Sequence, residues 1–224
     1  MIRIKICGIM NREDLDLCVK AGVHTLGFVV DYPLPVPWNL NPEQARQLID
    51  GVPPLVRSSV VTGGSVEKVM AIARAIRPDM IQLHYQETLA EVAEMARQLS
   101  YLGIKVIKAL RIDEEGRCAF EIPDPVAAAR ALSETGITAL LIDSFTSSLP
   151  GGTGVAVDLS TFRAIQQASV LPVILAGGLN SDNIGQIVRE VRPCAVDVLT
   201  GVEDRPGRKS PEKVYRFMEE ILAV

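Results

Sequence analysis

The chain has 224 residues, of which 48% are hydrophobic and 22% are charged. A chain of this length can fold as one α/β barrel domain, and its composition excludes a disordered protein. The net charge is 23 − 27 = −4 at pH 7 and the basic residues are scattered, which argues against nucleic acid or a membrane surface as the partner. The longest apolar run, residues 170–179, is too short to span a bilayer.

The cysteines and histidines narrow the class further. Cys7, Cys18, Cys118 and Cys194 show neither the spacing of a zinc site nor a dense disulfide pattern, so we expect reduced thiols in a cytoplasmic protein. The sequence has two histidines and no ligand cluster, which predicts no metal site. The chain start lacks the pattern of a signal peptide. No composition shift marks a second domain, so residues 1–224 are predicted to form one domain.

Eight short runs rich in apolar and β-branched residues predict strands. In chain order they are Ile2–Cys7, Thr25–Val30, Leu55–Val61, Met80–Leu83, Ile104–Ala109, Ala139–Ile142, Val173–Ala176 and Ala195–Val198. Stretches with helical spacing separate most of these runs, and one more closes the chain. In chain order they are Glu13–Ala21, Pro42–Asp50, Val66–Ile76, Thr88–Leu99, Pro125–Thr135, Leu159–Ala168, Asp182–Glu190 and Pro211–Leu222.

The alternation of strands and helices predicts the fold. Its mean spacing of 224/8 = 28 residues is typical of parallel βαβ units. An open doubly wound sheet is the main competing architecture. However, the first strand-to-helix turn, residues 7–11, lacks a dinucleotide-binding fingerprint. We therefore predict an α/β protein built as a closed (β/α)8 TIM barrel.

In such a barrel, the chemistry lies just past the carboxyl ends of the strands. Three of the last four loops are rich in glycine and hydroxyl residues, and glycine lets backbone amides approach an anion closely. The residues expected to form one phosphate cradle are Gly152, Thr153, Gly154, Gly177, Gly178, Thr200 and Gly201. For any single loop, the alternative is that the glycines only permit a tight turn.

Several motifs occur in the order and spacing of one enzyme family. They include Lys5-Ile6-Cys7-Gly8-Ile9, Gln82-Leu83-His84, Gly151-Gly152-Thr153-Gly154 and Leu175-Ala176-Gly177-Gly178-Leu179-Asn180. On these motifs, nearly the whole chain resembles the phosphoribosylanthranilate isomerases. The resemblance implies a cofactor-free Amadori rearrangement in tryptophan biosynthesis. That reaction converts N-(5-phosphoribosyl)anthranilate to 1-(2-carboxyphenylamino)-1-deoxyribulose 5-phosphate.

The resemblance also implies the catalytic roles. An aldose-to-ketose shift of a sugar amine needs an acid that opens the furanose ring and a base that removes the proton from the adjacent carbon. By resemblance, Asp143 is the acid and Cys7 is the base. A basic thiol needs some thiolate character, which Lys5 could supply from the same face of the strand. Without the resemblance, a lone strand cysteine is more simply a small buried hydrophobe.

Other strand-end residues are weaker candidates. Lys5, His84 and Asp197 are expected to contact the substrate. The alternatives are that His84 is satisfied by the adjacent backbone and that Asp197 pairs with Lys5 instead of a ribose hydroxyl. Arg111 is expected in a solvated loop after the fifth strand. Lys209 is expected on a solvated basic face together with its neighbours Arg205 and Arg208.

The loop after the second predicted strand departs from the family pattern. Many family members carry an arginine there that meets the anthranilate carboxylate, whereas this chain has Trp38 and no Arg or Lys in residues 31–40. A carboxylate clamp favours a guanidinium. Two alternatives therefore stay open, a paralogue that acts on a different phosphorylated sugar amine and a non-catalytic phosphosugar-binding barrel. The expected partner is a phosphorylated sugar, and the protein is expected to be a monomer or a homodimer.

Overall fold

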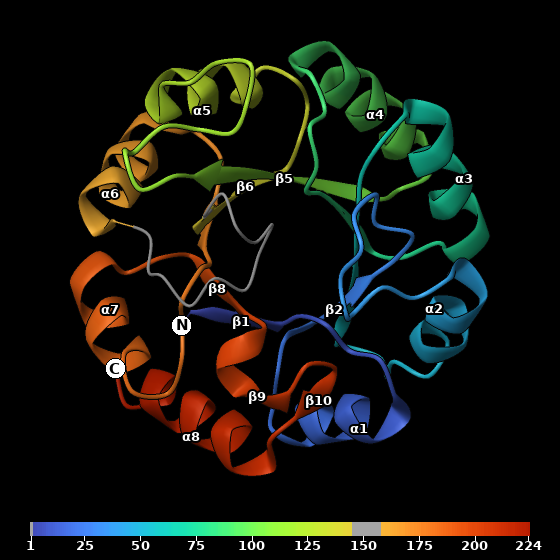
Figure 1. Ribbon diagram of the computed structural model, residues 1–224, viewed down its shortest axis with the longest axis vertical. Helices are drawn as coiled ribbons and strands as arrows, with labels where there is room; N and C mark the ends of the chain where they lie inside the picture. Colours follow the sequence, from blue (N-terminus) through green and yellow to red (C-terminus); the bar gives the residue numbers. More distant parts are fainter. Residues whose placement is uncertain (1, 145–157) are drawn as a thin grey trace.

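A computed structural model describes residues 2–144 and 158–224 and confirms the predicted barrel. Eight strands pair in parallel in the order β1-β2-β3-β4-β5-β6-β7-β8, and β8 pairs with β1 to close the sheet (Figure 1). The strands are β1 (Arg3–Ile6), β2 (Thr25–Val29), β3 (Arg57–Thr62), β4 (Met80–Leu83), β5 (Lys105–Ile112), β6 (Ala139–Ser144), β7 (Val173–Leu175) and β8 (Ala195–Val198).

Helices surround the sheet on the outside (Figure 1). They are α1 (Arg12–Lys20), α2 (Pro42–Ile49), α3 (Val66–Ile76), α4 (Leu89–Tyr101), α5 (Pro125–Ser133), α6 (Leu159–Ala168), α7 (Ile184–Val191) and α8 (Pro211–Leu222). A short helix η1 (Thr200–Val202) and a hairpin of β9 (Glu203–Arg205) and β10 (Arg208–Lys209) lie between β8 and α8.

Side-chain caps fix where several helices begin. The side chains of Asn41 and Thr88 each accept a hydrogen bond from the backbone N–H three residues later. Gln44 and Glu91 complete the two capping boxes by bonding back to the cap N–H groups. Each cap satisfies backbone donors that the first helical turn leaves unpaired. These caps set the ends of the strand-to-helix loops, and those loops surround one mouth of the barrel.

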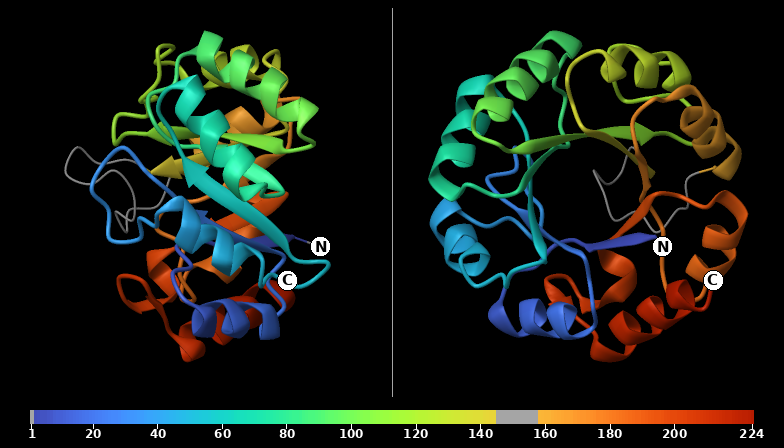
Figure 2. Two further views of the ribbon diagram at one scale, coloured as in Figure 1. Left: turned by 90° about the vertical axis from the view of Figure 1, so that its right-hand side faces the viewer. Right: turned by 180° about the vertical axis from the view of Figure 1, so that it is seen from behind.

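Alternation along the strands separates two parts of the core. Outward-facing side chains such as Phe28 pack beneath the helices, whereas Ile107, Ala109 and Leu141 form part of a separate apolar cluster inside the barrel. The strand-to-helix loops gather at one end, and both chain termini lie toward the other end (Figure 2). Among the described residues, no helix combines the length and hydrophobicity that a membrane span requires.

Several predicted strand ends differ from the structure, and the difference at the end of β5 changes the surroundings of a charged side chain. Strand β5 continues to Ile112, so Arg111 lies within the sheet, in register with Asp143, and is only 6% exposed. The predicted solvated loop begins later. The strand continues because the backbone of β6 pairs with β5 as far as Ser144.

Packing of the outer core predicts a large difference between two apolar truncations. We expect Phe28→Ala to lower the free energy of unfolding by about 3–5 kcal/mol, because Phe28 is fully buried and its loss leaves a cavity. Leu55→Ala is the control, because Leu55 is 99% exposed, and it should change stability by less than about 0.5 kcal/mol. Urea denaturation followed by circular dichroism measures both. Equal losses would contradict this packing.

Candidate active site

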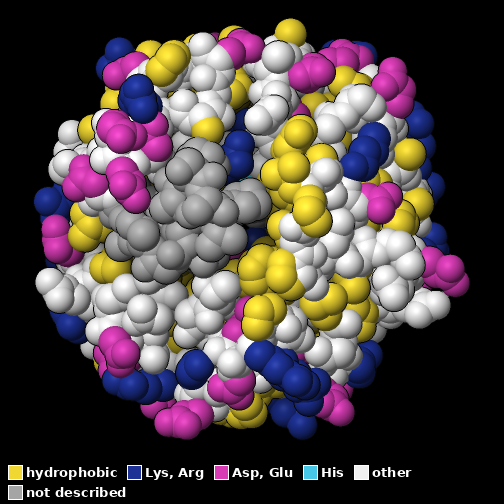
Figure 3. Space-filling model, viewed as in Figure 1, with side chains coloured by type: hydrophobic (Ala, Val, Ile, Leu, Met, Phe, Trp, Pro, Cys, Tyr) yellow, Lys and Arg dark blue, Asp and Glu magenta, His cyan; other side chains and the backbone are white. Residues whose placement is uncertain are grey.

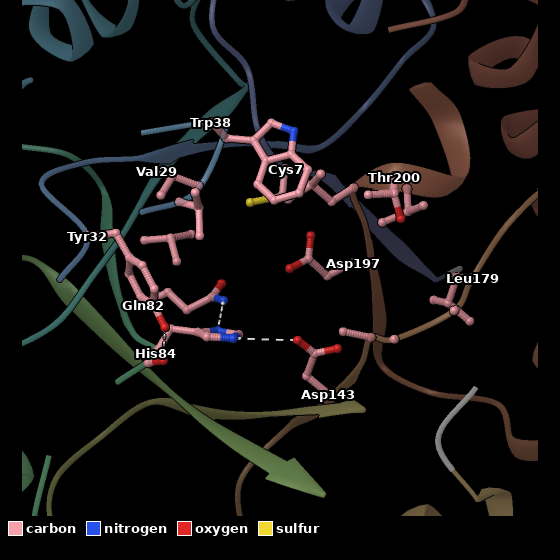
Figure 4. Close-up of a pocket in the computed structure, with 17 residues that line it drawn as sticks. Cys7, Val29, Tyr32, Trp38, Gln82, His84, Asp143, Leu179, Asp197 and Thr200 are labelled. Carbon is pink, nitrogen blue, oxygen red and sulfur yellow. Dashed lines mark hydrogen bonds and ion pairs between the residues drawn. The ribbon is translucent and has the colours of Figure 1, made fainter. Parts of the chain in front are cut away.

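The carboxyl ends of the strands surround one cavity that opens to solvent. Cys7 projects into it from the end of β1 and Asp197 from β8. Gln82 and His84 reach it from β4 and the residue just past its end, and Asp143 reaches it from β6 (Figure 4). The structure therefore brings the predicted catalytic residues Cys7 and Asp143 to one cavity. The predicted substrate-binding residues His84 and Asp197 line the same cavity. Gln82 was not predicted as a site residue.

Cys7 is held at the seam where the barrel closes. Its backbone N–H donates to the carbonyl of Val198 on β8 at 2.8 Å, and its side chain packs over Gly27 on β2. A Cβ atom at Gly27 would lie 2.7 Å from Cys7 Sγ, which is closer than such atoms can approach. The thiol therefore occupies space that only a glycine leaves open.

Lys5 and Asp197 form a buried ion pair beneath the thiol. The two residues are register partners on β1 and β8, and Lys5 Nζ lies 2.6 Å from Asp197 Oδ2. Burial alone would lower the pKa of Lys5, but the negative charge of Asp197 and the hydrogen bonds to Asp197 and Cys7 outweigh it, so the pKa is raised and the ammonium is retained. Asp197 Oδ1 is buried and has no hydrogen-bond partner among the described residues. Lys5 does not line the cavity itself and reaches it through these neighbours.

The environment of Cys7 favours its protonated form in the free protein. Burial raises the pKa of the Cys7 thiol, and the positive charge of Lys5 opposes this shift without overcoming it. Lys5 thus lowers the pKa of the thiol, as expected, but burial raises that pKa by more, so the thiol is not a thiolate in the free protein. Lys5 can stabilise a thiolate as it forms during a reaction, because its ammonium stays charged beside the sulfur.

Asp143 and His84 face each other across the cavity wall. His84 Nε2 lies 3.5 Å from Asp143 Oδ2, and the other ring nitrogen, Nδ1, lies 3.1 Å from the amide nitrogen of Gln82 (Figure 4). The alternative that the adjacent backbone satisfies the ring of His84 does not hold, because both ring nitrogens contact side chains. In Figure 4, Cys7 and Asp143 lie on opposite sides of the cavity with Asp197 between them.

Part of the predicted phosphate cradle also reaches this cavity. Gly177, Gly178 and Thr200 line it, and both glycines have positive φ angles of 85° and 63°. A Cβ at Gly177 would lie 2.5 Å from Ser144 Oγ, so both backbone angle and space require glycine there. Gly201 packs beneath the rim, where a Cβ would lie 1.9 Å from the carbonyl oxygen of Leu179. The predicted residues Gly152, Thr153 and Gly154 lie outside the described residues.

Trp38 forms the apolar wall beside Cys7. Its indole N–H donates to the buried carboxylate of Glu203 at 3.0 Å, and its ring covers Gly8. Glu203 also accepts from the backbone N–H of Gly207 at 3.2 Å and pairs with Lys209 Nζ at 2.9 Å. Figure 3 shows hydrophobic side chains gathered on this face of the molecule. The apolar cluster that contains Cys7 includes the partly buried side chains of Leu34, Val36, Trp38, Tyr85 and Leu199.

The expectation that Lys209 is solvated was wrong. Its side chain is fully buried, because the carboxylate of Glu203, six residues earlier, neutralises its charge inside the hairpin that β9 and β10 form. Arg205 is exposed, as expected, and Arg208 is partly buried against the start of α1. Cys18 and Cys118 are buried free thiols and Cys194 is exposed, and none of the three lines the cavity.

The charges around the cavity are distributed unevenly. Among the described residues that line it, none is Lys or Arg. Within residues 2–144 and 158–224, no three His, Cys, Asp or Glu side chains are grouped to hold a metal ion. The described lining offers two carboxylates, a thiol, an imidazole and backbone amides, a set that suits proton transfer at a neutral or anionic small molecule.

Comparisons with known proteins agree with this geometry. The sequence model of the N-(5'-phosphoribosyl)anthranilate (PRA) isomerase family matches residues 4–220. The chain belongs to this family. A relative with that name from Geobacter metallireducens is 37% identical over 226 residues and spans 100% of both chains. Another from Natronomonas pharaonis is 34% identical over 220 residues and covers 98% of this chain and 97% of its own.

Solved structures of the family share the fold over the full chain. Phosphoribosyl anthranilate isomerase from Thermotoga maritima superposes with a TM-score of 0.83 at 30% identity and 100% coverage of both chains. A second structure superposes with a TM-score of 0.80 at 29% identity, again over 100% of both chains. That protein is in complex with reduced 1-(o-carboxyphenylamino)-1-deoxyribulose 5-phosphate. The protein is therefore an enzyme of this isomerase family.

The buried pair at the seam predicts a strongly coupled effect on stability. We expect Lys5→Met to lower the free energy of unfolding by about 3–5 kcal/mol, because it leaves the Asp197 carboxylate buried without its counter-ion. The double variant Lys5→Met/Asp197→Leu should recover most of that loss, because no charge is left unpaired. Chemical denaturation of the wild-type protein, Lys5→Met, Asp197→Leu and the double variant measures the cycle. Additive losses would show that the two side chains do not act as a pair.

Proposed function

We propose that the protein converts N-(5-phosphoribosyl)anthranilate to 1-(2-carboxyphenylamino)-1-deoxyribulose 5-phosphate, with Asp143 as general acid and Cys7 as general base. The observation that carries the proposal is the position of these two side chains across one cavity that glycine backbone also lines. The family membership of the chain supports the same reaction. The proposal places the protein in tryptophan biosynthesis.

The first step opens the sugar ring. Asp143 donates a proton to the furanose ring oxygen while the lone pair of the substrate nitrogen forms a double bond to C1. The bond between C1 and the ring oxygen breaks, which leaves an iminium and a new hydroxyl group. Asp143 ends this step as a carboxylate near the positive iminium, an arrangement that stabilises both charges.

The second step moves the double bond. Cys7 first gives up its thiol proton to the solvent that reaches the open cavity. The resulting thiolate removes the proton from C2, and the electron pair of the C2–H bond forms a C1–C2 double bond and neutralises the iminium. The resulting enol tautomerises, with loss of its hydroxyl proton and gain of one at C1, to the ketone of the product. The Lys5 ammonium favours the thiolate that this step requires, against the burial that raises the pKa of the thiol.

The remaining predicted residues bind the phosphosugar. Gly177, Gly178 and Thr200 line the cavity and present backbone N–H groups of the kind that bind phosphate. Gly152, Thr153 and Gly154 are proposed to complete the cradle, as the family motif implies. Gly201 supports the rim from beneath. The free oxygen of Asp197 is proposed to accept a hydrogen bond from a ribose hydroxyl, because it is buried at the cavity and has no other partner among the described residues.

The aglycone lies against the apolar wall in this proposal. Trp38, Val29, Val36 and Val61 line the cavity on the side of Cys7 and suit an aromatic ring. The described lining has no basic side chain for a carboxylate. That observation favours, as a second candidate, a reaction of the same kind on a phosphorylated sugar amine whose aglycone is uncharged.

One assay tests the function directly. The purified protein is mixed with phosphoribosylanthranilate, and turnover is followed as loss of the anthranilate fluorescence of the substrate. We expect turnover in vitro, and we expect the gene to rescue a tryptophan auxotroph that lacks this step. Binding without turnover would favour the non-catalytic alternative. Turnover only with other phosphoribosyl amines would favour the second candidate.

The two catalytic residues should each be required for turnover. We expect Cys7→Ala and Asp143→Asn to lower kcat by roughly 10²–10⁴-fold, the usual contribution of one positioned proton-transfer group, while the far-ultraviolet circular dichroism stays unchanged. Cys18→Ala is a matched control, because that thiol is buried away from the cavity. Near-normal turnover by Cys7→Ala would remove the thiol from the mechanism.

Position 38 should control affinity for a charged aglycone. An absent charge-assisted hydrogen bond costs about 1.5–3 kcal/mol, so wild-type protein should show a high KM for phosphoribosylanthranilate. Trp38→Arg should then raise kcat/KM by roughly 10–150-fold. Trp38→Phe is the control, because it keeps an aromatic ring and adds no charge. A low micromolar wild-type KM that Trp38→Arg does not improve would show that a cation from elsewhere, such as the buried Arg111, binds the carboxylate.

A further inference from the structure

Three side chains lie in a row from the interior of the barrel to the proposed general acid. The amide nitrogen of Gln82 is 3.1 Å from His84 Nδ1, and His84 Nε2 is 3.5 Å from Asp143 Oδ2 (Figure 4). Gln82 is only 2% exposed. Because Gln82 and His84 are two residues apart along an extended segment, their side chains point to the same face. The spacing along β4 therefore places Gln82 and His84 side by side, and β6 brings Asp143 to the end of the row.

The backbone and ring of His84 are held from several sides. Its N–H donates to the carbonyl of Thr62 on β3 at 3.0 Å, and its carbonyl accepts from the hydroxyl of Tyr32 at 2.8 Å. Burial raises the pKa of Tyr32 to about 12, so this hydroxyl stays protonated and remains a donor. The rings of Tyr32 and His84 also meet edge to face, with centroids 6.3 Å apart. The backbone bonds fix where the side chain of His84 starts, and the ring contact with Tyr32 restrains the imidazole itself.

The amide of Gln82 determines which imidazole nitrogen carries the proton. An amide N–H that donates to Nδ1 needs a lone pair there, so the proton of a neutral ring lies on Nε2. Nε2–H then points at Asp143 Oδ2. An oxygen that accepts this hydrogen bond is a poor place for the acid proton, which is therefore directed to Oδ1. Oδ1 lies on the side of Gly177, which lines the cavity where the sugar is proposed to bind.

We propose that Gln82 and His84 are positioning residues that fix the proton of Asp143 on the carboxyl oxygen that faces the substrate. This inference rests on the proposed role of Asp143 as the general acid. The same Nε2–H donor stabilises the carboxylate that remains after Asp143 has given its proton to the ring oxygen. The separation of 3.5 Å is long for such a bond, and catalytic hydrogen bonds of this kind shorten when the substrate is bound.

The tautomer can be measured without any activity. The chain has only two histidines, His24 and His84, so two-bond proton–nitrogen correlation spectra of ¹⁵N-labelled protein resolve both rings. We expect the His84 pattern of a neutral ring with hydrogen on Nε2. In Gln82→Glu, a carboxylate that can only accept should draw a proton to Nδ1 and change the pattern, while His24 stays as it is. An Nδ1–H pattern in the wild-type protein would overturn the proposal.

Kinetics then test whether the row matters for the reaction. We expect His84→Ala to lower kcat by roughly 10–100-fold, the cost of a misplaced catalytic group, with KM changed by less than about 3-fold. His84→Gln should restore most of the loss, because its terminal amide can again donate to Asp143. Gln82→Glu should lower kcat in the same way. A loss that falls on KM alone, or no loss, would show that the row is only structural.

These outcomes separate the inference from the proposed function. If wild-type protein does not turn over phosphoribosylanthranilate, the proposed function fails, whereas the spectra still report the tautomer. If wild-type protein is active and His84→Ala keeps its full kcat, the function stands and the inference fails. Gln98→Glu, at a partly exposed position on α4 that contacts Glu94, is the control for an added charge. It should leave both kcat and the His84 pattern unchanged.

Discussion

The pairing of β1 with β8 is the constraint on which the site depends. This pairing closes the sheet, and it sets Lys5 directly beside Asp197 inside the barrel. A buried charge is tolerated only when an opposite charge neutralises it, so the two residues fix the register of the seam as well as its stability. The same register places Cys7 under the rim, where its N–H bonds to Val198. An ion pair at the seam thus links the fold to the position of the proposed base.

The cavity divides into two chemical halves around that seam. On one side, valines and Trp38 form an apolar wall over the thiol, which explains why burial dominates the pKa of Cys7. On the other side, the imidazole of His84 lies beside Asp143, and the amide of Gln82 lies beside the imidazole. During catalysis the proposed base, Cys7, must accept a proton and the proposed acid, Asp143, must donate one. The two halves supply different surroundings for these two tasks.

Trp38 connects the apolar wall to the far side of the seam. Its indole N–H bonds to Glu203, which Lys209 neutralises beneath the loop after β8. The loops after the second and eighth strands are thereby joined across the mouth of the barrel. Trp38 carries no charge, but it still has a hydrogen-bond partner in Glu203. The departure from the family pattern is therefore accommodated in the fold, whatever its effect on the aglycone.

The sequence predicted the barrel well because strand and helix periods are local. The strands Met80–Leu83 and Ala195–Val198 and the helices Val66–Ile76 and Pro211–Leu222 begin and end where they were predicted. The motifs also indicated the strand ends at which Cys7, His84, Asp143 and Asp197 meet.

Charged residues with distant partners could not be predicted in this way. Arg111 and Lys209 were predicted to be solvated. Nothing nearby in the sequence shows that β5 continues past Ala109, or that the β9–β10 hairpin encloses Lys209. Gln82 was missed for a related reason. Its role depends on Asp143, which lies more than one βα unit away along the chain. Its only local signal is its spacing of two residues from His84.

The central claim is that Cys7 and Asp143 act from facing sides on one phosphosugar, and a crystal structure with a bound product analogue tests it most directly. The analogue to use is reduced 1-(o-carboxyphenylamino)-1-deoxyribulose 5-phosphate, which a structural relative binds. The account predicts the phosphate over Gly177 and Gly178, the thiol beside C2, and Asp143 Oδ1 within about 2.6–3.2 Å of the former ring oxygen. An analogue bound with C2 beyond reach of Cys7 and the former ring oxygen beyond reach of Asp143 would contradict it.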